Sequence, residues 1–170
     1  MLPLAACAQT KAVSPLAVVL HGPDGAPVPL ASALDAHPIT VIEFFSATCP
    51  CQRAHDARIA DLRTAMAARD VGFYVVDSER GAPPREPRGY PIFQDPGSLL
   101  ARRLGADYAT YSVLLGRHGE VLYKGGFDSD RTHLASDRVP YLENAIEDAL
   151  AGRPVRVPET KALGCTLETR

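Results

Sequence analysis

Hydrophobic residues in this chain fall into short β-branched runs and one long stretch with helical spacing. Ile39–Phe45 is apolar at nearly every position, which is typical of a strand buried on both faces of a sheet. In residues 50–70, apolar side chains recur every three or four positions, so a helix is predicted directly after that strand. Gly72 then precedes a second apolar run, Phe73–Asp77. This order predicts a β-α-β unit with a parallel strand pair.

The segments around this unit carry weaker but consistent signals. Residues 78–91 contain four prolines and two glycines and are therefore predicted to form a loop. The order of elements predicts an α/β fold with a central mixed β-sheet flanked by helices and an N-terminal β-hairpin. The other predicted elements are a hairpin over 16–30 that turns at Pro23-Asp24-Gly25, a helical turn from Ser32, a strand at Ile92-Phe93, a helix over 96–104, strands over 111–115 and 120–124, and a helix over 139–151.

Length and charge narrow the function classes. A chain of 170 residues fits one domain, here assigned to residues 16–152, with residues 1–15 as a leader and residues 153–170 as a C-terminal extension. The net charge of -2 gives no basic field, so nucleic acid is not expected as a partner. No apolar run reaches the roughly 18 residues of a membrane span. The pattern gives no indication of the oligomeric state.

The extreme N-terminus contains a short motif that resembles a targeting signal. Leu4-Ala5-Ala6-Cys7 resembles the processing site of bacterial lipoproteins, in which Cys7 would become the lipid-modified first residue. Only Met1, Leu2 and Pro3 stand where such a signal has a basic region and an apolar stretch. The alternative is a chance coincidence of common residues. The first interpretation predicts a protein of the bacterial cell envelope, either periplasmic or attached to the membrane only through that lipid.

Three further cysteines point to thiol chemistry. Cys49 and Cys51 lie where the buried strand turns into the helix, and a helix N-terminus favours the reactive thiolate. Arg53 and His55 would add positive charge nearby. Cys165, in the extension, is either a resolving thiol for this pair or a tail cysteine without a role.

The sequence around the cysteines resembles the active site of the thioredoxin superfamily. Phe44 to Cys51 match the strand end and helix start, and residues 113–126 resemble the last two strands of that fold. The C-terminal region resembles a bacterial redoxin or AhpC/TSA-like group. The resemblance implies a thiol–disulfide oxidoreductase that acts on protein thiols or disulfides without a bound organic cofactor. In it Cys49 would be the likelier nucleophile, Cys51 its partner and Cys165 a second resolving thiol.

Two features depart from the superfamily pattern. Only Pro50 separates the cysteines, where the usual pair has two intervening residues, so a Cys49–Cys51 disulfide would close a tight and strained ring. Thioredoxins also carry a cis-proline before the penultimate strand, whereas this chain has Thr110 near that place. Substrate docking of the ordinary thioredoxin kind is therefore not assured by the sequence.

Two alternative functions remain open. Thr48 stands three residues before Cys51, as in peroxiredoxins, which would make Cys51 the peroxidatic cysteine of a thiol peroxidase acting on peroxides. Phe44 occupies the place of the proline expected in that pattern. The cysteine pair with a histidine would instead suit Cu(I), as in copper carriers of this fold, although Tyr111 stands where those proteins have their histidine.

Three acidic residues lie in or after the predicted strands of this region. Glu43 interrupts the apolar strand below the cysteines and is either a buried carboxylate that relays protons or a residue at a sheet edge. Asp128 and Asp130 are expected in a solvated loop rather than in a metal site.

Overall fold

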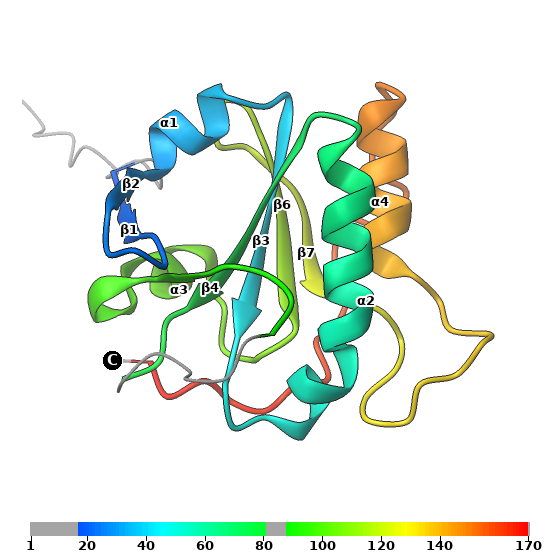
Figure 1. Ribbon diagram of the computed structural model, residues 1–170. Coiled ribbons are helices and arrows are strands. Elements are labelled where there is room, and N and C mark those ends of the chain that lie inside the picture. Colours follow the sequence, from blue (N-terminus) through cyan, green and yellow to red (C-terminus); the bar gives the residue numbers. More distant parts are fainter. Residues whose placement is uncertain (1–16, 81–87, 170) are drawn as a thin grey trace, which may run out of the picture.

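A seven-stranded mixed sheet organises the protein (Figure 1), and the computed structural model describes residues 17–80 and 88–169. The strand order is β2-β1-β5-β4-β3-β6-β7. The predicted N-terminal hairpin is present as the antiparallel pair β1 and β2. The strands are β1 (Val19–His21), β2 (Pro27–Pro29), β3 (Ile39–Phe45), β4 (Val71–Asp77), β5 (Ile92–Gln94), β6 (Tyr111–Gly116) and β7 (Val121–Gly126).

Strand β3 is the centre of the sheet, as its continuous apolar run predicts. It pairs in parallel with β4 and antiparallel with β6, and all seven of its residues are buried. The parallel register joins Phe45 to Asp77, so β3 and β4 end at the same edge of the sheet. The predicted β-α-β unit is confirmed, and the cysteine pair follows directly on the carboxyl end of its first strand.

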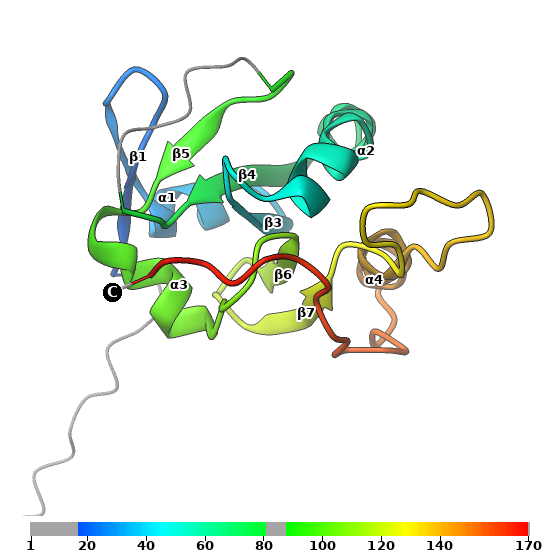
Figure 2. The same ribbon diagram turned by 90° about the horizontal axis from the view of Figure 1, so that it is seen from below.

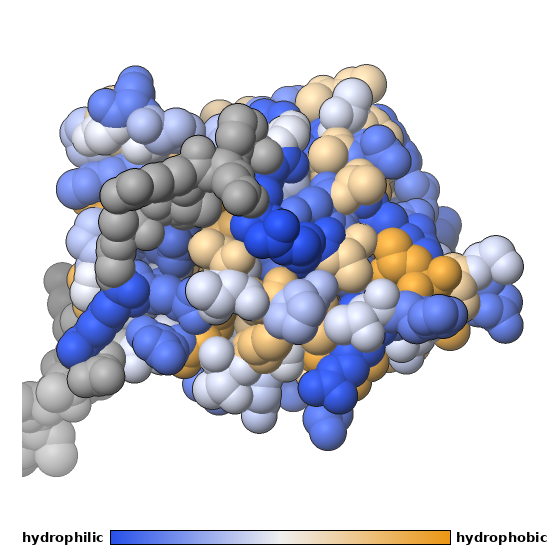
Figure 3. Space-filling model, turned by 60° about the horizontal axis from the view of Figure 1, so that its bottom comes forward, coloured by the Kyte–Doolittle hydropathy of each residue, from blue (hydrophilic) through white to orange (hydrophobic). Residues whose placement is uncertain are grey.

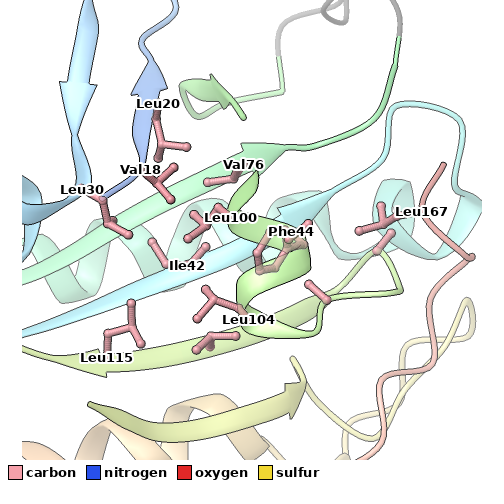
Figure 4. Packing of buried hydrophobic residues seen from close by; sticks show 14 of the residues in the cluster. Val18, Leu20, Leu30, Ile42, Phe44, Val76, Leu100, Leu104, Leu115 and Leu167 are labelled. Carbon is pink, nitrogen blue, oxygen red and sulfur yellow. The ribbon is translucent and has the colours of Figure 1, made fainter. Parts of the chain in front are cut away.

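Helices cover both faces of the sheet (Figures 1 and 2). Helices α2 (Pro50–Ala67) and α4 (Tyr141–Leu150) lie on one face, and α1 (Leu30–Asp35) and α3 (Leu99–Leu104) lie on the other. Each face has its own hydrophobic core. The core around α1 and α3, shown in Figure 4, includes Phe44 and Leu167 and extends to the cysteines.

Some boundaries differ from the predicted ones for local reasons. The predicted helix over 96–104 is a 3₁₀ turn, η1 (Pro96–Ser98), followed by α3, because Gly97 and Ser98 have φ values of 68° and 54°. A positive φ interrupts α-helical hydrogen bonding. Helix α1 begins at Leu30, before the predicted cap at Ser32. Within residues 17–80 and 88–169, no helix is both long and apolar enough to cross a bilayer.

The C-terminal tail, residues 153–169, runs back across the molecule without forming a helix or a strand of the sheet. It leaves α4, passes along β7 and crosses the sheet edge where β3 ends (Figures 1 and 2). Isolated bridges join Glu159 to Lys124 and Thr166 to Tyr108. The tail therefore extends over the edge at which the cysteine pair lies.

Candidate functional site

Cys49 and Cys51 lie at the N-terminus of α2. Cys49 is the N-cap residue with an extended backbone, and Pro50 follows at the first helical position, where a missing N–H is harmless. Both side chains are almost fully buried, with 2% and 3% of their surface exposed. The helix end supplies unpaired N–H groups that favour a thiolate over a thiol.

Cys165 completes a cluster of three thiols. Its backbone N–H donates a hydrogen bond to the Cys49 sulfur at 3.3 Å. The sulfur atoms of Cys49, Cys51 and Cys165 all lie within 4.8 Å of one another, and all three cysteines are free. The structure thus brings together the three cysteines that the sequence singled out.

Backbone hydrogen bonds hold the tail in this position. Ala109 N–H donates to the Cys165 carbonyl at 2.8 Å, and Leu167 N–H donates to the Asp107 carbonyl at 2.9 Å. The Leu167 side chain is buried in the same hydrophobic core as Phe44 (Figure 4). Tail residues on both sides of Cys165 are therefore anchored to the segment before β6.

Two glycines permit this close approach. A Cβ added to Gly164 would lie 1.7 Å from the Ala109 carbonyl oxygen, far inside van der Waals contact. Gly125, on β7, has a φ of 148° and faces Thr160, whose hydroxyl would lie 2.3 Å from an added Cβ. The tail could not follow its present path with a side chain at Gly164.

The pKa values of the Cys49 and Cys165 thiols are shifted in opposite directions. Burial alone would raise the pKa of Cys49. Hydrogen bonds from the Cys165 thiol and from the backbone N–H groups of Gln52, Cys165 and Cys51 outweigh burial, and the net pKa is below that of a free thiol. Burial raises the pKa of Cys165 to about 12, with further increases from the hydrogen bond to Cys49 and from the charges of Cys49 and Cys51. The arrangement favours a Cys49 thiolate that accepts a hydrogen bond from a protonated Cys165.

Thr110 lies near the place where the sequence comparison with thioredoxins expects a cis-proline, and no described peptide bond is cis. It has a φ of 57°, which is rare for a β-branched residue, and its N–H donates to the Phe44 carbonyl at 2.9 Å. Its carbonyl accepts from Phe127 N–H at 3.1 Å. On its N-terminal side, the Ala109 N–H is already paired with the Cys165 carbonyl of the tail.

Thr48 is the residue on which the peroxidase interpretation rests. It is exposed, and its hydroxyl lies 3.4 Å from the Ser46 hydroxyl. The loop that carries it is fixed by Arg88, which donates to the Ala47 carbonyl at 3.1 Å and to Asp56 at 2.8 Å. Sequence reasoning missed Arg88, whose role depends on a long-range contact with no local pattern.

His55 lies on α2, one turn after Cys51, and is almost completely buried. Its Nδ1 faces the Cys51 carbonyl at 2.8 Å and its Nε2 faces the Asp128 carboxylate at 2.9 Å. Burial alone would lower the pKa of His55, but the bond to Asp128, the Cys51 carbonyl and nearby negative charges outweigh it and raise the pKa. The surroundings therefore favour the protonated form of His55, and both of its ring nitrogens have partners within the protein.

The expectation of a solvated loop is wrong for Asp128, which is 2% exposed. Its carboxylate also accepts a hydrogen bond from Arg58 Nη1 at 2.7 Å, and the same nitrogen donates to Asp130 at 2.8 Å. Arg58 Nη2 donates to the Ala135 carbonyl at 2.9 Å. A charged residue after a predicted strand gave no sign of burial, because its partners come from α2, some 70 residues earlier.

Glu43 is buried at the centre of the sheet, so the interpretation as an edge residue is wrong. Ser112, its neighbour on β6, donates a hydrogen bond to Oε2, while Oε1 has no partner within the described residues. Burial raises the pKa of Glu43 to about 8, against smaller opposing effects of Ser112 and His55. The side chain is thus largely protonated at neutral pH.

The remaining predictions about the site concern residue 7 and a histidine ligand. Cys7 lies outside the described residues. Within the described ranges, the group of side chains with metal-ligand geometry consists of the three cysteines and includes no histidine.

Similarity to solved structures is clear, although no protein-family model and no curated protein matches the chain. A hypothetical protein from Sinorhizobium meliloti is 23% identical with a TM-score of 0.77, over 89% of this chain and 90% of that one. A candidate thiol:disulfide interchange protein DsbE from Chlorobium tepidum is 20% identical with a TM-score of 0.58, over 78% and 92%. The exposed lipoprotein thioredoxin of Streptococcus pneumoniae is 16% identical with a TM-score of 0.56, over 79% and 97%. The chain has a thioredoxin-like fold.

Proposed function

We propose that this protein is a thiol–disulfide oxidoreductase in which Cys49 is the nucleophile and Cys165 resolves the mixed disulfide. The observation that carries the proposal is the direct contact between Cys49 and Cys165, two residues 116 positions apart in the chain. The tail has its own backbone hydrogen bonds to the rest of the chain, and it places the Cys165 thiol beside the buried Cys49 thiol. A resolving role explains this placement, whereas an inert buried thiol would not require it. The substrates are protein disulfides or dithiols.

The first step uses the lowered pKa of Cys49. Its thiolate attacks one sulfur of a partner disulfide, forms a mixed disulfide and releases the other partner sulfur as a thiolate. The N–H groups at the start of α2 stabilise the attacking charge. Attack by Cys49 therefore precedes any attack by Cys165, whose pKa is raised.

The second step follows from the loss of charge in the first. Once Cys49 is in a mixed disulfide, the negative charge that helps to raise the Cys165 pKa has gone, although burial remains. Cys165 then loses its proton, attacks the Cys49 sulfur and expels the second partner sulfur as a thiolate. The partner is reduced by two electrons and the chain holds a Cys49–Cys165 disulfide; the reverse sequence oxidises a partner dithiol.

Cys51 has a secondary role in this scheme. With one residue between them on the first turn of a helix, Cys49 and Cys51 would close a strained ring. The Cys51 carbonyl is also fixed by His55, which opposes the backbone change that such a ring requires. The bond to Cys165 has no comparable constraint within α2.

Access to Cys49 requires the tail to move. Cys49 is buried, and the tail segment around Cys165 lies against it. On the visible part of this face, hydrophobic residues are scattered among hydrophilic ones (Figure 3), which suits a transient rather than a permanent protein contact. A partner would displace the tail, react with Cys49 and leave when the tail returns.

The proposed location is the bacterial cell envelope, periplasmic or attached through a lipid on Cys7. A compartment outside the cytosol sustains disulfide exchange. The similar structures described as a lipoprotein thioredoxin and as a DsbE protein support the same location.

The experiment that tests the function is a trap of the mixed disulfide. A Cys7→Ser chain that also carries Cys165→Ser should accumulate a covalent adduct with a model disulfide peptide, detected by intact mass. A Cys7→Ser chain that carries Cys49→Ser and keeps Cys165 should form no adduct. A Cys7→Ser chain that carries Cys51→Ser and keeps Cys165 should turn over without accumulating the adduct. Accumulation in the Cys51→Ser chain instead would assign the resolving role to Cys51.

The same set of variants separates this function from a peroxidase. A peroxidase would consume hydrogen peroxide in a single turnover and form a sulfenic acid on Cys51. Rapid oxidation of Cys51 by one equivalent of peroxide, with no reaction toward the disulfide peptide, would contradict the proposal.

A further inference from the structure

The three cysteines form a second chemical feature when all are reduced. Their sulfurs lie within 4.8 Å of one another, a spacing at which one small ion between them could be bonded to all three. They come from two elements that are far apart in sequence and are both fixed, the start of α2 and the anchored tail. Such an arrangement is a ligand set already in place.

We propose that the reduced protein binds one Cu(I) ion through the sulfurs of Cys49, Cys51 and Cys165. This site does not depend on the disulfide chemistry proposed above, and its third ligand is Cys165 rather than the histidine considered from the sequence. The ion replaces the thiol protons, which pass to solvent, and no electron is transferred.

The donor set decides the choice of ion. Thiolates are soft ligands and select Cu(I), Zn(II) or iron–sulfur clusters. Cu(I) is satisfied by three thiolates in a trigonal plane, whereas structural Zn(II) sites are closed by four ligands. Within the described residues no histidine or carboxylate joins the three sulfurs, and both nitrogens of nearby His55 are used by the protein.

The surroundings fit a soft ion, and the N-terminus of α2 offsets part of the net negative charge that three thiolates and one Cu(I) carry. Cys49 and Cys51 are buried in the hydrophobic core that also contains Phe44, Ala109 and Leu167. The Cys165 N–H donates to the Cys49 sulfur, as outer-shell donors do in metal–thiolate sites. Burial would shield the bound ion from water and oxidants.

The site predicts that metal binding and disulfide formation exclude each other. A Cys49–Cys165 disulfide removes two of the three ligands, so an oxidised chain would not bind the ion. Conversely, a bound ion would protect the three thiols from alkylation. This competition gives a readout that does not depend on turnover with a protein substrate.

The test is an anaerobic titration of the reduced full-length chain, with Cys7→Ser to remove the fourth thiol, against the Cu(I)–bathocuproine disulfonate complex. We expect one Cu(I) per chain and an X-ray absorption spectrum with a single shell of three sulfurs. Cys49→Ser, Cys51→Ser and Cys165→Ser should each lose at least the roughly 10–100-fold in affinity that loss of an outer-shell contact costs a metal site. Thr166→Ala, an exposed position on the same tail, should bind like the parent.

Three results would overturn the site: unchanged affinity in Cys165→Ser, a nitrogen or oxygen ligand in the absorption spectrum, or displacement of Cu(I) by an equal amount of Zn(II). If a serine variant fails to fold by circular dichroism, the spectrum of the parent still decides. The adduct trap run on the same preparation separates the two proposals, because each can fail while the other holds.

Discussion

At the scale of single residues, this protein buries charge around its thiols in a way that composition does not reveal. His55 and Asp128 are paired at 2.9 Å with almost no exposed surface, and Arg58 binds the second carboxylate oxygen. Glu43, on β3, is buried, and one of its carboxylate oxygens has no partner within the described residues. His55, held by Asp128, fixes the Cys51 carbonyl in the first turn of α2.

Asp128→Asn should destabilise the protein by about 3–5 kcal/mol, the typical cost of breaking a buried ion pair from one side. The pKa of Asp128 is lowered in the fold because its bonds to His55 and Arg58 outweigh burial, so its contribution is present above about pH 3.9 and is lost as the pH falls further. The pKa of His55 is raised, so its contribution is complete below about pH 6.5 and declines as the pH rises through the folded value. The stability gap to wild type should therefore be widest between about pH 4 and 6.5.

Urea unfolding at several pH values measures this gap. Asp137→Asn, an exposed change in the same loop, is the matched control and should have little effect at any pH. A gap that is equally wide at all pH values would show that the ion pair is not its cause.

Glu43→Gln should stabilise the protein increasingly as the pH rises from about 4.5 to about 8. Burial raises the folded pKa of Glu43 to about 8 from 4.5, so the folded state holds a proton that the unfolded chain has released. Wild-type stability then falls with pH in this window, by at most about 1.4 kcal/mol per unit. Glutamine is neutral throughout and can still accept the hydrogen bond from Ser112. A constant difference between the two proteins in denaturant unfolding from pH 5 to 9 would contradict the assigned protonation.

At the scale of elements, the tail is the feature that makes this site unlike an open redox site. It follows a path set by the bonds to Ala109 and Asp107 and by the absence of a side chain at Gly164. It covers Cys49 and supplies Cys165 in the same conformation. In the proposed mechanism, the tail therefore controls both access to Cys49 and resolution of the mixed disulfide.

Gly164→Ala should loosen this contact without removing any thiol. A Cβ at that position overlaps the Ala109 carbonyl, and overpacking of this kind costs about 1–3 kcal/mol. If the cost falls on tail docking, Cys49 should react with iodoacetamide roughly 5- to 150-fold faster, and formation of the Cys49–Cys165 disulfide should slow. Thr166→Ala keeps the tail backbone and should change neither rate; equal alkylation of wild type and Gly164→Ala would mean that the tail does not gate Cys49.

At the scale of the whole molecule, the sequence predicted the sheet better than it predicted how the tail and the buried charges enclose the cysteines. The apolar run in β3 and the helical spacing in α2 are local patterns driven by burial, so strand, helix and their order followed from them. The burial of Asp128 and the docking of Gly164 against Ala109 join segments far apart in sequence, and no local pattern encodes them. The sequence indicated Cys165 as a candidate resolving thiol, but it did not predict the contact between Gly164 and Ala109 that places this thiol.

A whole-molecule consequence concerns stability in the oxidised state. The cysteines of a Cys49–Cys165 disulfide are 116 positions apart in the chain, and loops of about 100 residues gain roughly 4.7 kcal/mol from reduced unfolded-chain entropy. A Cys49–Cys51 disulfide closes a very short loop and should add far less. Guanidinium unfolding of oxidised and reduced protein should therefore show a large gain in wild type and a small one in Cys165→Ser; equal gains in both would place the disulfide within α2.

The most direct test of the account is a disulfide map of the Cys7→Ser chain, reduced fully and then oxidised with one equivalent of a small disulfide. Peptide mass spectrometry should find Cys49 joined to Cys165, with Cys51 free. A Cys49–Cys51 bond with Cys165 free, or pairing that appears only with peroxide, would contradict the central claim that the tail supplies the resolving thiol.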